Sequence, residues 1–238
     1  MALIRGTRHD DTLYASDGDK VNAFAGNDEV YLSGGENAVL LGRGNDAVYG
    51  WNQSGQVWGG VGDDTLYWWG SGTAVGGKGN DSVYAFDTGA IYGDEGPGLQ
   101  SKTAGNDFMF TLATSAGGDG TQTGGKGADL HFFNAHFDGL GGASVCDVTD
   151  FTAGQDKLGM ALSYATPEGV GAGYLSSSSI WSILDTNGDG VLNGADVPPD
   201  WTVSGTAVVG DNLAIRVGDD TMWIEHTTSI TAADWLFT

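Results

Sequence analysis

The chain has 238 residues, and its 31 acidic residues against 9 lysines and arginines give a net charge of −22. This charge repels nucleic acid and anionic membrane surfaces, and no apolar run is long enough to span a membrane, so we expect neither nucleic acid nor a membrane span. The single cysteine, Cys146, excludes an internal disulfide, and 42 glycines with only 4 prolines are typical of a turn-rich β protein.

A Gly-x-Asp-x-apolar phrase recurs through the first part of the chain. Its aspartates lie 17 or 18 residues apart, and weaker phrases between them repeat the apolar position every 8 or 9 residues. This interval is not helical; it predicts short strands with one inward side chain each and two strands per coil. The predicted inward residues are Leu13, Val21, Val30, Val39, Val48, Val57, Leu66, Val75, Val83 and Ile91.

Two segments, residues 59–67 and 76–84, match the nonapeptide Gly-Gly-x-Gly-x-Asp-x-apolar-x in full. In this the chain resembles the repeats-in-toxin (RTX) family, whose repeats wind into a parallel β-roll. The resemblance implies an all-β fold, a β-roll followed by a β-rich C-terminal region. It also implies that turn carbonyls and the aspartate of one coil hold Ca²⁺ against the next coil, since Ca²⁺ takes six to eight oxygens and glycines let carbonyls converge.

The strong repeats recur once per coil and therefore stack on one edge. We predict calcium along that edge and hydrogen-bonded turns along the other. Residues 1–96 hold 14 acidic and 5 basic residues, so about four divalent ions would offset most of their repulsion and couple metal binding to folding. The alternative is that these aspartates are ordinary turn residues. The predicted ligands are Asp10, Asp11, Gly26, Asn27, Asp28, Gly44, Asn45, Asp46, Gly62, Asp63, Asp64, Gly79, Asn80 and Asp81.

The residue after the apolar position of each strong repeat is a tyrosine that we expect to face outward. These tyrosines support the sheet by stacking, or they form a docking stripe for a glycan, another copy or the second half of the chain. The residues are Tyr14, Tyr31, Tyr49, Tyr67 and Tyr84, with Trp58, Trp68 and Trp69 nearby in the sequence.

The rhythm breaks at residues 93–98, which we expect to form a loop. Two later phrases retain the Gly-x-Asp turn and make Asp107 and Asp129 further candidate calcium ligands. Residues 148–158 are similar to the segment that closes β-rolls in secreted RTX proteins; the alternative is an ordinary strand–turn–strand. We expect three regions: the roll at 1–96, a degenerate closing region at 97–160, and a β-rich region at 161–238.

A second metal motif lies at residues 185–196. Oxygen donors stand at loop positions 1, 3, 5, 9 and 12, with Gly190 at position 6 and the carbonyl of position 7, as in EF-hand and dockerin-like calcium loops. Residues 179–184 read as an entering helix, whereas Pro198-Pro199 shorten the exiting one. With Asp in place of Glu at position 12 and no second loop as a partner, we expect a structural site. The candidate ligands are Asp185, Asn187, Asp189, Val191, Asn193 and Asp196.

The last segment alternates as a β-hairpin over residues 213–225. Residues 230–238 are similar to the C-termini of RTX proteins exported by type I secretion, which implies a secreted, extracellular or cell-surface protein of a Gram-negative cell. The alternative for this end is a final strand or helical turn packed on the core.

The sequence has no His-Glu-x-x-His motif and no Gly-x-Ser-x-Gly motif, so we expect no enzyme. The repeats begin within six residues of Met1, which leads us to expect a stand-alone protein. The resemblance implies a calcium-binding protein with a structural or adhesive role in a surface layer, extracellular matrix or docking complex, folding on extracellular Ca²⁺. The alternative is a glycan-binding accessory protein related to modules of polysaccharide-active enzymes. Candidate partners besides calcium are cell-surface glycans and other copies of the chain.

Overall fold

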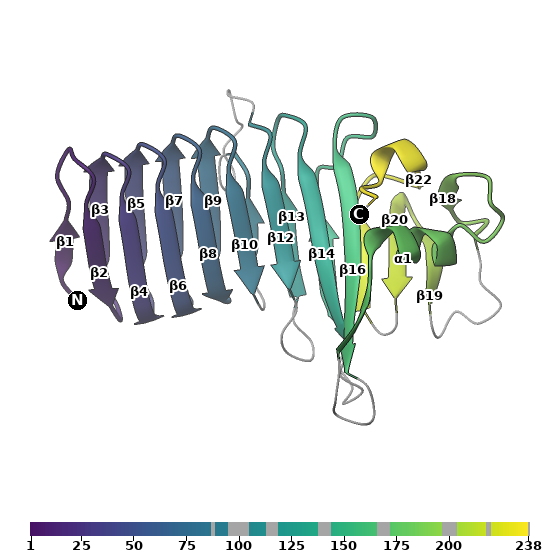
Figure 1. The fold of residues 1–238 in the computed structure, drawn as a ribbon, viewed down its shortest axis with the longest axis horizontal. Coiled ribbons are helices and arrows are strands. Elements are labelled where there is room, and N and C mark those ends of the chain that lie inside the picture. The colour runs from purple at the N-terminus through teal and green to yellow at the C-terminus, as the bar shows by residue number, and fades with distance from the viewer. Residues whose placement is uncertain are drawn as a thin grey trace.

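Alternating apolar and polar residues set the secondary structure along most of this chain. The structure, a computed structural model, describes residues 1–86, 89–94, 105–112, 119–137, 144–165, 172–196, 204–217 and 220–237. Over these ranges the protein is mostly β, with two large and mainly parallel sheets and a small two-stranded one (Figure 1). No helix in the described ranges is long and apolar enough to cross a membrane.

The first large sheet holds eleven strands. Its neighbours pair in parallel from β1 to β21, and β20 and β19 add antiparallel strands at one end. In spatial order the strands are β1 (Leu3–Arg5), β3 (Lys20–Ala25), β5 (Ala38–Arg43), β7 (Gln56–Val61), β9 (Thr73–Lys78), β11 (Ala90–Tyr92), β13 (Asp119–Thr123), β15 (Val145–Val148), β21 (Asp220–Ile224), β20 (Asn212–Val217) and β19 (Ser204–Val209).

The second large sheet holds nine strands, which are parallel except for the antiparallel pair of β16 with β17. In spatial order they are β2 (Thr12–Ser16), β4 (Glu29–Gly35), β6 (Ala47–Gln53), β8 (Thr65–Gly70), β10 (Ser82–Phe86), β12 (Phe108–Leu112), β14 (Leu130–Phe137), β16 (Lys157–Ala165) and β17 (Ala172–Leu175).

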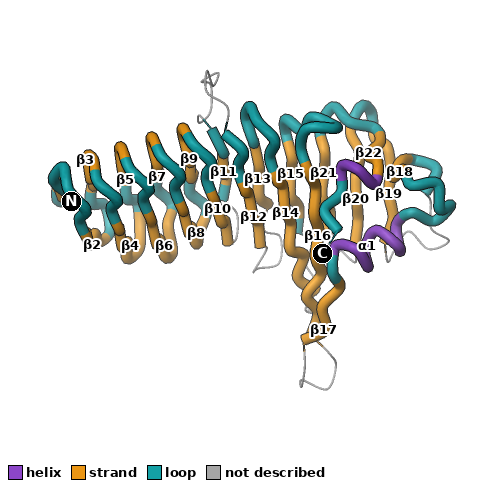
Figure 2. The backbone as a smooth tube through the Cα atoms, turned by 45° about the horizontal axis from the view of Figure 1, so that its top comes forward, coloured by secondary structure: helices purple, strands orange, loops and turns teal. Residues whose placement is uncertain are grey.

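From β1 to β16 the chain alternates between the two large sheets, so that one odd and one even strand with their turns form a coil (Figures 1 and 2). Equivalent residues of successive coils lie side by side; for example, Val30 is paired in register with Val48, and Val48 with Leu66. The strand pairing passes from β10 to β12 and β14 without a change of sheet. The boundary that we placed at residue 96 remains a prediction.

The core of the first coils lies between the two sheets. The inward apolar residues of both sheets form one cluster in which Val30, Val48 and Leu66 from even strands meet Val39 and Val57 from odd strands. Most of these side chains are small and aliphatic, so the interior is narrow, and the turns rather than a large core must contribute much of the cohesion.

One predicted inward residue is wrong. Ala74 is paired with Val57 and Ile91 and belongs to the core cluster between the sheets, whereas Val75 is paired with Trp58 and Tyr92 on the outer side of the sheet, where it is nevertheless only 2 % exposed. The cause is a register shift near the ends of β6 and β8. Gly50 pairs with Trp68 and Gln53 pairs with Gly70, so β8 has one residue fewer than β6 between these two pairs. The shortened interval therefore falls before residue 74, and a spacing rule alone cannot tell on which side of an inward residue it falls.

The C-terminal end has its own core. Helix α1 (Ser177–Leu184) begins at the N-cap Ser176, whose side chain accepts a hydrogen bond from the Ser179 N–H, and contributes Ile180, Trp181 and Leu184 to a second apolar cluster. The expected helix and hairpin are both present, the hairpin as β20 and β21. Strands β18 (Val191–Asn193) and β22 (Ser229–Thr231) form the small sheet, followed by a 3₁₀ turn at Ala232–Asp234.

Candidate functional site

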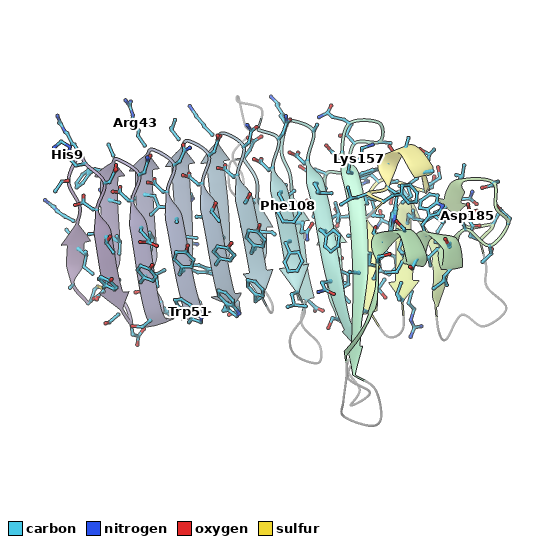
Figure 3. The ribbon with its side chains drawn as sticks, viewed as in Figure 1. His9, Arg43, Trp51, Phe108, Lys157 and Asp185 are labelled. Atoms are coloured by element: carbon cyan, nitrogen blue, oxygen red, sulfur yellow. The ribbon has the colours of Figure 1, made fainter. Side chains whose placement is uncertain are left out.

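The Gly-x-Asp turns all connect an odd strand to the following even strand, so the structure brings them to one edge of the molecule. Arg43, which precedes the turn at Gly44, and Lys157, which follows the last of these turns, mark this edge in Figure 3. The edge is formed by two columns of side chains, an inner column of aspartates and an outer column of asparagines and aspartates.

The inner column is a ladder of hydrogen bonds between coils. Each aspartate N–H donates to the Oδ1 atom of the aspartate in the next coil, at 2.7–3.0 Å. From Asp28 onward these side chains are 1–2 % exposed. The ladder runs through Asp11, Asp28, Asp46, Asp64, Asp81, Asp107, Asp129 and Asp156.

The outer column runs in the opposite sense. Here the N–H of the later coil donates to the Oδ1 atom of the earlier one, at 2.7–3.0 Å, and the side chains are exposed. Because an amide and a carboxylate can both accept this bond, either Asn or Asp can occupy this position. The side chains are Asp10, Asn27, Asn45, Asp63, Asn80 and Asn106.

The second oxygen of the inner carboxylates is the exceptional atom at this edge. The Oδ2 atoms of Asp28, Asp46, Asp64, Asp81 and Asp107 are buried and have no hydrogen-bond partner. A buried carboxylate oxygen without a partner is costly, and here the same deficit recurs in five coils. A cation or a proton at each oxygen would remove it.

Burial also raises the pKa of these carboxyl groups. Desolvation is the largest cause in each case, and it is opposed by the N–H bond of the neighbouring coil and reinforced by adjacent aspartates. The pKa is raised to about 6 for Asp46, about 7 for Asp64 and Asp81, and about 8 for Asp107. The pKa of Asp129 is likewise raised to about 7. Positive charge near these oxygens would therefore be stabilising.

The glycines at the edge leave room beside these oxygens. A Cβ atom at Gly59 would overlap both the Oδ2 atom of Asp64 and the carbonyl oxygen of Gly76, so a carboxylate and a carbonyl from the next coil face one small space. A Cβ atom at Gly93 would meet Asp107 and Gly124 in the same way. Oxygens of these two kinds are calcium ligands.

The aspartates lie one per coil rather than in clusters. Among the residues that the structure describes, no group of three or more His, Cys, Asp or Glu side chains is placed to hold a metal ion. A cation at this edge would therefore draw most of its oxygens from the backbone, including the turn glycines Gly26, Gly44, Gly62 and Gly79.

Three acidic residues of this edge were not among the predicted ligands. Asp94 is buried with its Oδ1 atom unpartnered, and its Oδ2 atom accepts from the Lys126 N–H at 2.7 Å. Asp150 accepts from Gly124 and Gly125, and Asp156 ends the inner ladder. None of the three continues the 17- or 18-residue spacing of the earlier aspartates, although Asp156 stands in the segment at 148–158 that is similar to the closing segment of β-rolls.

The opposite edge is closed by hydrogen bonds. Asn37 donates from Nδ2 to the Gly34 carbonyl at 2.8 Å and accepts from the Asp19 N–H at 3.1 Å. Backbone bonds join later turns, including Thr73 N–H to the Gly55 carbonyl at 3.0 Å. Three stretches of this edge, residues 87–88, 113–118 and 138–143, lie outside the described residues.

The loop at 185–196 is held by hydrogen bonds between its own residues. The Gly190 N–H donates to Asp185 Oδ2 at 3.1 Å, and Gly188 and Gly190 have positive φ values of 71° and 77°. Asp189 accepts from the Val191 N–H at 2.8 Å, and the Oδ1 atom of Asp185 is buried without a partner. The side chain at position 1 is thus held with one oxygen free for a ligand.

Asp196, at position 12, closes this loop. Its carboxylate accepts from the Thr186 N–H at 3.1 Å and the Asn193 N–H at 3.0 Å, and the residue is fully buried. Asn187 and Asn193 likewise accept N–H bonds within the loop, from Asp189 and Ala195. The exiting segment at Pro198-Pro199 lies outside the described residues.

No second loop was predicted as a partner for this loop, but in the structure it pairs with a strand near the C-terminus. Strand β18, which is loop positions 7–9, pairs antiparallel with β22 near the C-terminus, with Leu192 opposite Ile230. The Ala232 N–H then donates to the Gly190 carbonyl at 3.0 Å. The alternative considered for residues 230–238, a final strand or turn packed on the core, is present in its described part, since Ile230 and Trp235 lie in the C-terminal cluster.

Comparison with models of known protein families and with curated proteins finds no match for this chain. What the site can do is therefore inferred from its own geometry.

Proposed function

We propose that this protein is a secreted calcium-binding protein of the RTX type with a structural or adhesive role outside the cell. In this proposal the two large sheets are the faces of a parallel β-roll, and the turns between them hold calcium. The observation that carries the proposal is the row of five buried aspartates whose Oδ2 atoms have no partner.

The residues at the edge fit a hard cation. Asp64 and Asp107 each keep one oxygen on the ladder and present the other beside a glycine carbonyl of a neighbouring coil, that of Gly76 and Gly124 respectively. Bound calcium would supply positive charge between coils, and Asp185 would bring the loop at 185–196 into the same chemistry. The candidate ligands at Asp107 and Asp129 extend the row beyond the regular repeats.

Because the chain is strongly acidic, we expect it to fold where calcium is abundant and to stay unfolded where calcium is scarce. In the cytosol, where free calcium is scarce, repulsion among the acidic turns keeps such a chain unfolded and exportable. Outside the cell, calcium at about millimolar concentration offsets that repulsion and favours the folded state. The secretion-like C-terminus identified in the sequence fits this order of events.

The test is a calcium titration of the purified chain, followed by far-ultraviolet circular dichroism. We expect a weak β signal in chelator and a cooperative rise as Ca²⁺ is added. Light scattering on the same samples tests the structural role, for which large particles should grow only when calcium is present. An unchanged β spectrum in chelator contradicts the proposal.

A further inference from the structure

The outer face of the nine-stranded sheet carries two parallel rows of aromatic rings. In the first row the tyrosines of successive strands are paired in register, and their ring centroids are 5.3, 5.2, 5.3 and 4.7 Å apart with planes within 15° of parallel. The row comprises Tyr14, Tyr31, Tyr49, Tyr67 and Tyr84.

The second row lies beside the first. Trp51, Trp69 and Phe86 stack at 5.6 and 4.1 Å, and Trp51 and Trp69 lie 6.4 and 6.3 Å from the tyrosines of their own strands. Figure 3 shows the rings as a band that crosses the strands, with Trp51 near one end of its strand. Tyr14 is 70 % exposed and Trp51 48 % exposed, so part of this band is open to solvent.

Stacking explains why the rings lie parallel, but it does not explain why the strands that carry them have almost no charged residues. The five strands β2, β4, β6, β8 and β10 contain no lysine or arginine, and Glu29 is their only charged residue. The carboxylate of Glu29 accepts a hydrogen bond from the Tyr31 hydroxyl at 2.6 Å. In a chain with a net charge of −22, this face is nearly free of charge.

The charge pattern decides between occupants. The five strands carry no lysine or arginine for an anionic polymer to bind, and the acidic side chains elsewhere repel such a polymer or a second copy wherever calcium does not neutralise them. A neutral polysaccharide needs no cation on this face and is not repelled by the acidic side chains. Within each row the ring faces pack against one another, so the faces left open are those at the row ends, Tyr14 on the edge strand and Trp51 beside Ser33. The partly positive C–H groups of a sugar ring can pack against these faces, while the tyrosine hydroxyls along the row can bond sugar hydroxyls.

The regular interval of the rings favours a partner that is itself a flat repeating chain. We propose that the two-row aromatic face of strands β2 to β10 binds a neutral, extended polysaccharide lying along the row, with Trp51, Trp69 and the tyrosines as its contacts. This inference names the partner of the proposed adhesive function and rests on it for the folded, calcium-loaded state.

The experiment measures retention of the full chain on microcrystalline cellulose and on chitin in calcium buffer, with soluble alginate as the anionic comparison. The test variant is Trp51→Ala with Trp69→Ala. The control is Trp58→Ala, a tryptophan on β7 of the other sheet. Circular dichroism of each sample establishes that the variant is folded before it is compared.

We expect retention on at least one neutral polysaccharide, no binding of alginate, at least tenfold weaker retention of the double variant, and an unchanged result for Trp58→Ala. Folded protein that ignores both neutral polymers, or a folded double variant that is retained as well as the wild type, overturns the inference while leaving the calcium proposal intact. A dimer in gel filtration that the double variant abolishes assigns the face to a second copy and also overturns it. A chain that folds fully in chelator and still binds through Trp51 and Trp69 contradicts only the calcium proposal.

Discussion

At the scale of single residues, the inner aspartates combine two roles that are usually separate. One oxygen of Asp64 accepts the Asp46 N–H at 2.8 Å and holds adjacent coils in register, whereas the other is buried without a partner. The first role needs only an acceptor, which Asn supplies equally well. The second oxygen needs a cation or a proton beside it, and of these two residue types only Asp has a negative charge that either can neutralise. Substituting Asn therefore separates the two.

For Asp64→Asn we expect opposite effects with and without metal. In chelator the variant should be at least as stable as the wild type, because the ladder bond is kept and a buried charge is removed. In calcium it should require at least about tenfold more Ca²⁺ to reach its folding midpoint, since ligand charge sets calcium affinity. Circular dichroism at graded Ca²⁺ concentrations measures both.

The matched control for this variant is Asp63→Asn, in the exposed outer column where Asn already occurs in other coils. It should shift the calcium midpoint much less. If Asp64→Asn and Asp63→Asn behave alike in calcium, the inner oxygens have no special role in binding metal.

The raised pKa values predict how the metal-free chain responds to pH. The pKa of Asp64, Asp81 and Asp107 in the folded state is about 7, 7 and 8, above the ordinary value of 3.8. Groups raised in this way favour the folded state fully below pH 4, and that contribution is lost as the pH rises toward 8. In chelator the β signal should therefore be larger at pH 5 than at pH 8.

Calcium should reverse that trend. Because protons and Ca²⁺ compete for the same oxygens, the calcium midpoint should rise as the pH falls below about 7. Titrations at pH 5, 6.5 and 8 test this. A calcium midpoint that does not vary with pH would show that these carboxyl groups are not the ligands.

At the scale of elements, the turns fix how closely coils can approach. Gly62 has a φ of +133°, and a Cβ atom there would overlap the carbonyl oxygen of Gly44 in the preceding coil. Gly18, in a turn at the other edge, also has a positive φ of +74° but open space around it. Both glycines therefore have a positive φ, but only Gly62 has a neighbouring atom where a Cβ would lie.

Replacing these glycines by alanine should therefore have unequal costs. Gly18→Ala should lower the free energy of unfolding by about 1–2 kcal/mol, the cost of a left-handed alanine. Gly62→Ala should lower it by at least about 3 kcal/mol, because the coils must also separate. Urea unfolding in saturating calcium measures both, and equal losses would mean that close stacking at this edge is unimportant.

The pairing of β18 with β22 links the loop at 185–196 to the C-terminal segment. We expect Asp185→Asn to speed hydrogen exchange in residues 185–196 and 229–237 together, at calcium concentrations that saturate the wild type. Peptides from residues 20–86 should be unaffected. Exchange mass spectrometry resolves these regions, with the exposed Asp119→Asn as control. Faster exchange confined to the loop itself would show that the C-terminus docks independently.

Repetition made part of this structure predictable from sequence. The 17- and 18-residue spacing identified the aspartates that share one edge, whereas the calcium sites themselves, including the one at 185–196, remain predictions. Features that depend on a local change in coil length could not be read in this way. Ala74, and not Val75, belongs to the core cluster because of a one-residue register shift, and Asp94 and Asp150 do not continue the 17- or 18-residue spacing.

Contacts distant in sequence were also out of reach. Nothing near residues 191–193 indicates that residues 229–231 will pair with them, because the bond is made by backbone groups that every residue carries. Trp68 and Trp69 are adjacent in the sequence and share a residue type, yet Trp68 is buried in the core and Trp69 faces outward. The alternation of a strand predicts that the two differ, and only the register decides which one is inside.

At the scale of the whole molecule, stacked coils contact mainly their neighbours, so cohesion at the shared edge propagates along the long axis. Small-angle scattering should report this as a change of size. In chelator the radius of gyration should approach about 50 Å, the value for an unfolded chain of this length. Calcium should reduce it sharply, whereas sodium chloride of equal ionic strength should not. An equal decrease of the radius of gyration in sodium chloride would show that calcium acts by screening charge and not by binding at specific sites.

The most direct measurement is the position of the ions themselves. A crystal structure grown in calcium, with anomalous difference maps, should show a row of peaks beside the Oδ2 atoms of Asp28, Asp46, Asp64, Asp81 and Asp107. Each peak should be shared between coils and also ligated by turn carbonyls. A well-ordered structure at neutral pH in calcium, with the same folded edge and no peak beside these oxygens, would show that this edge does not bind calcium.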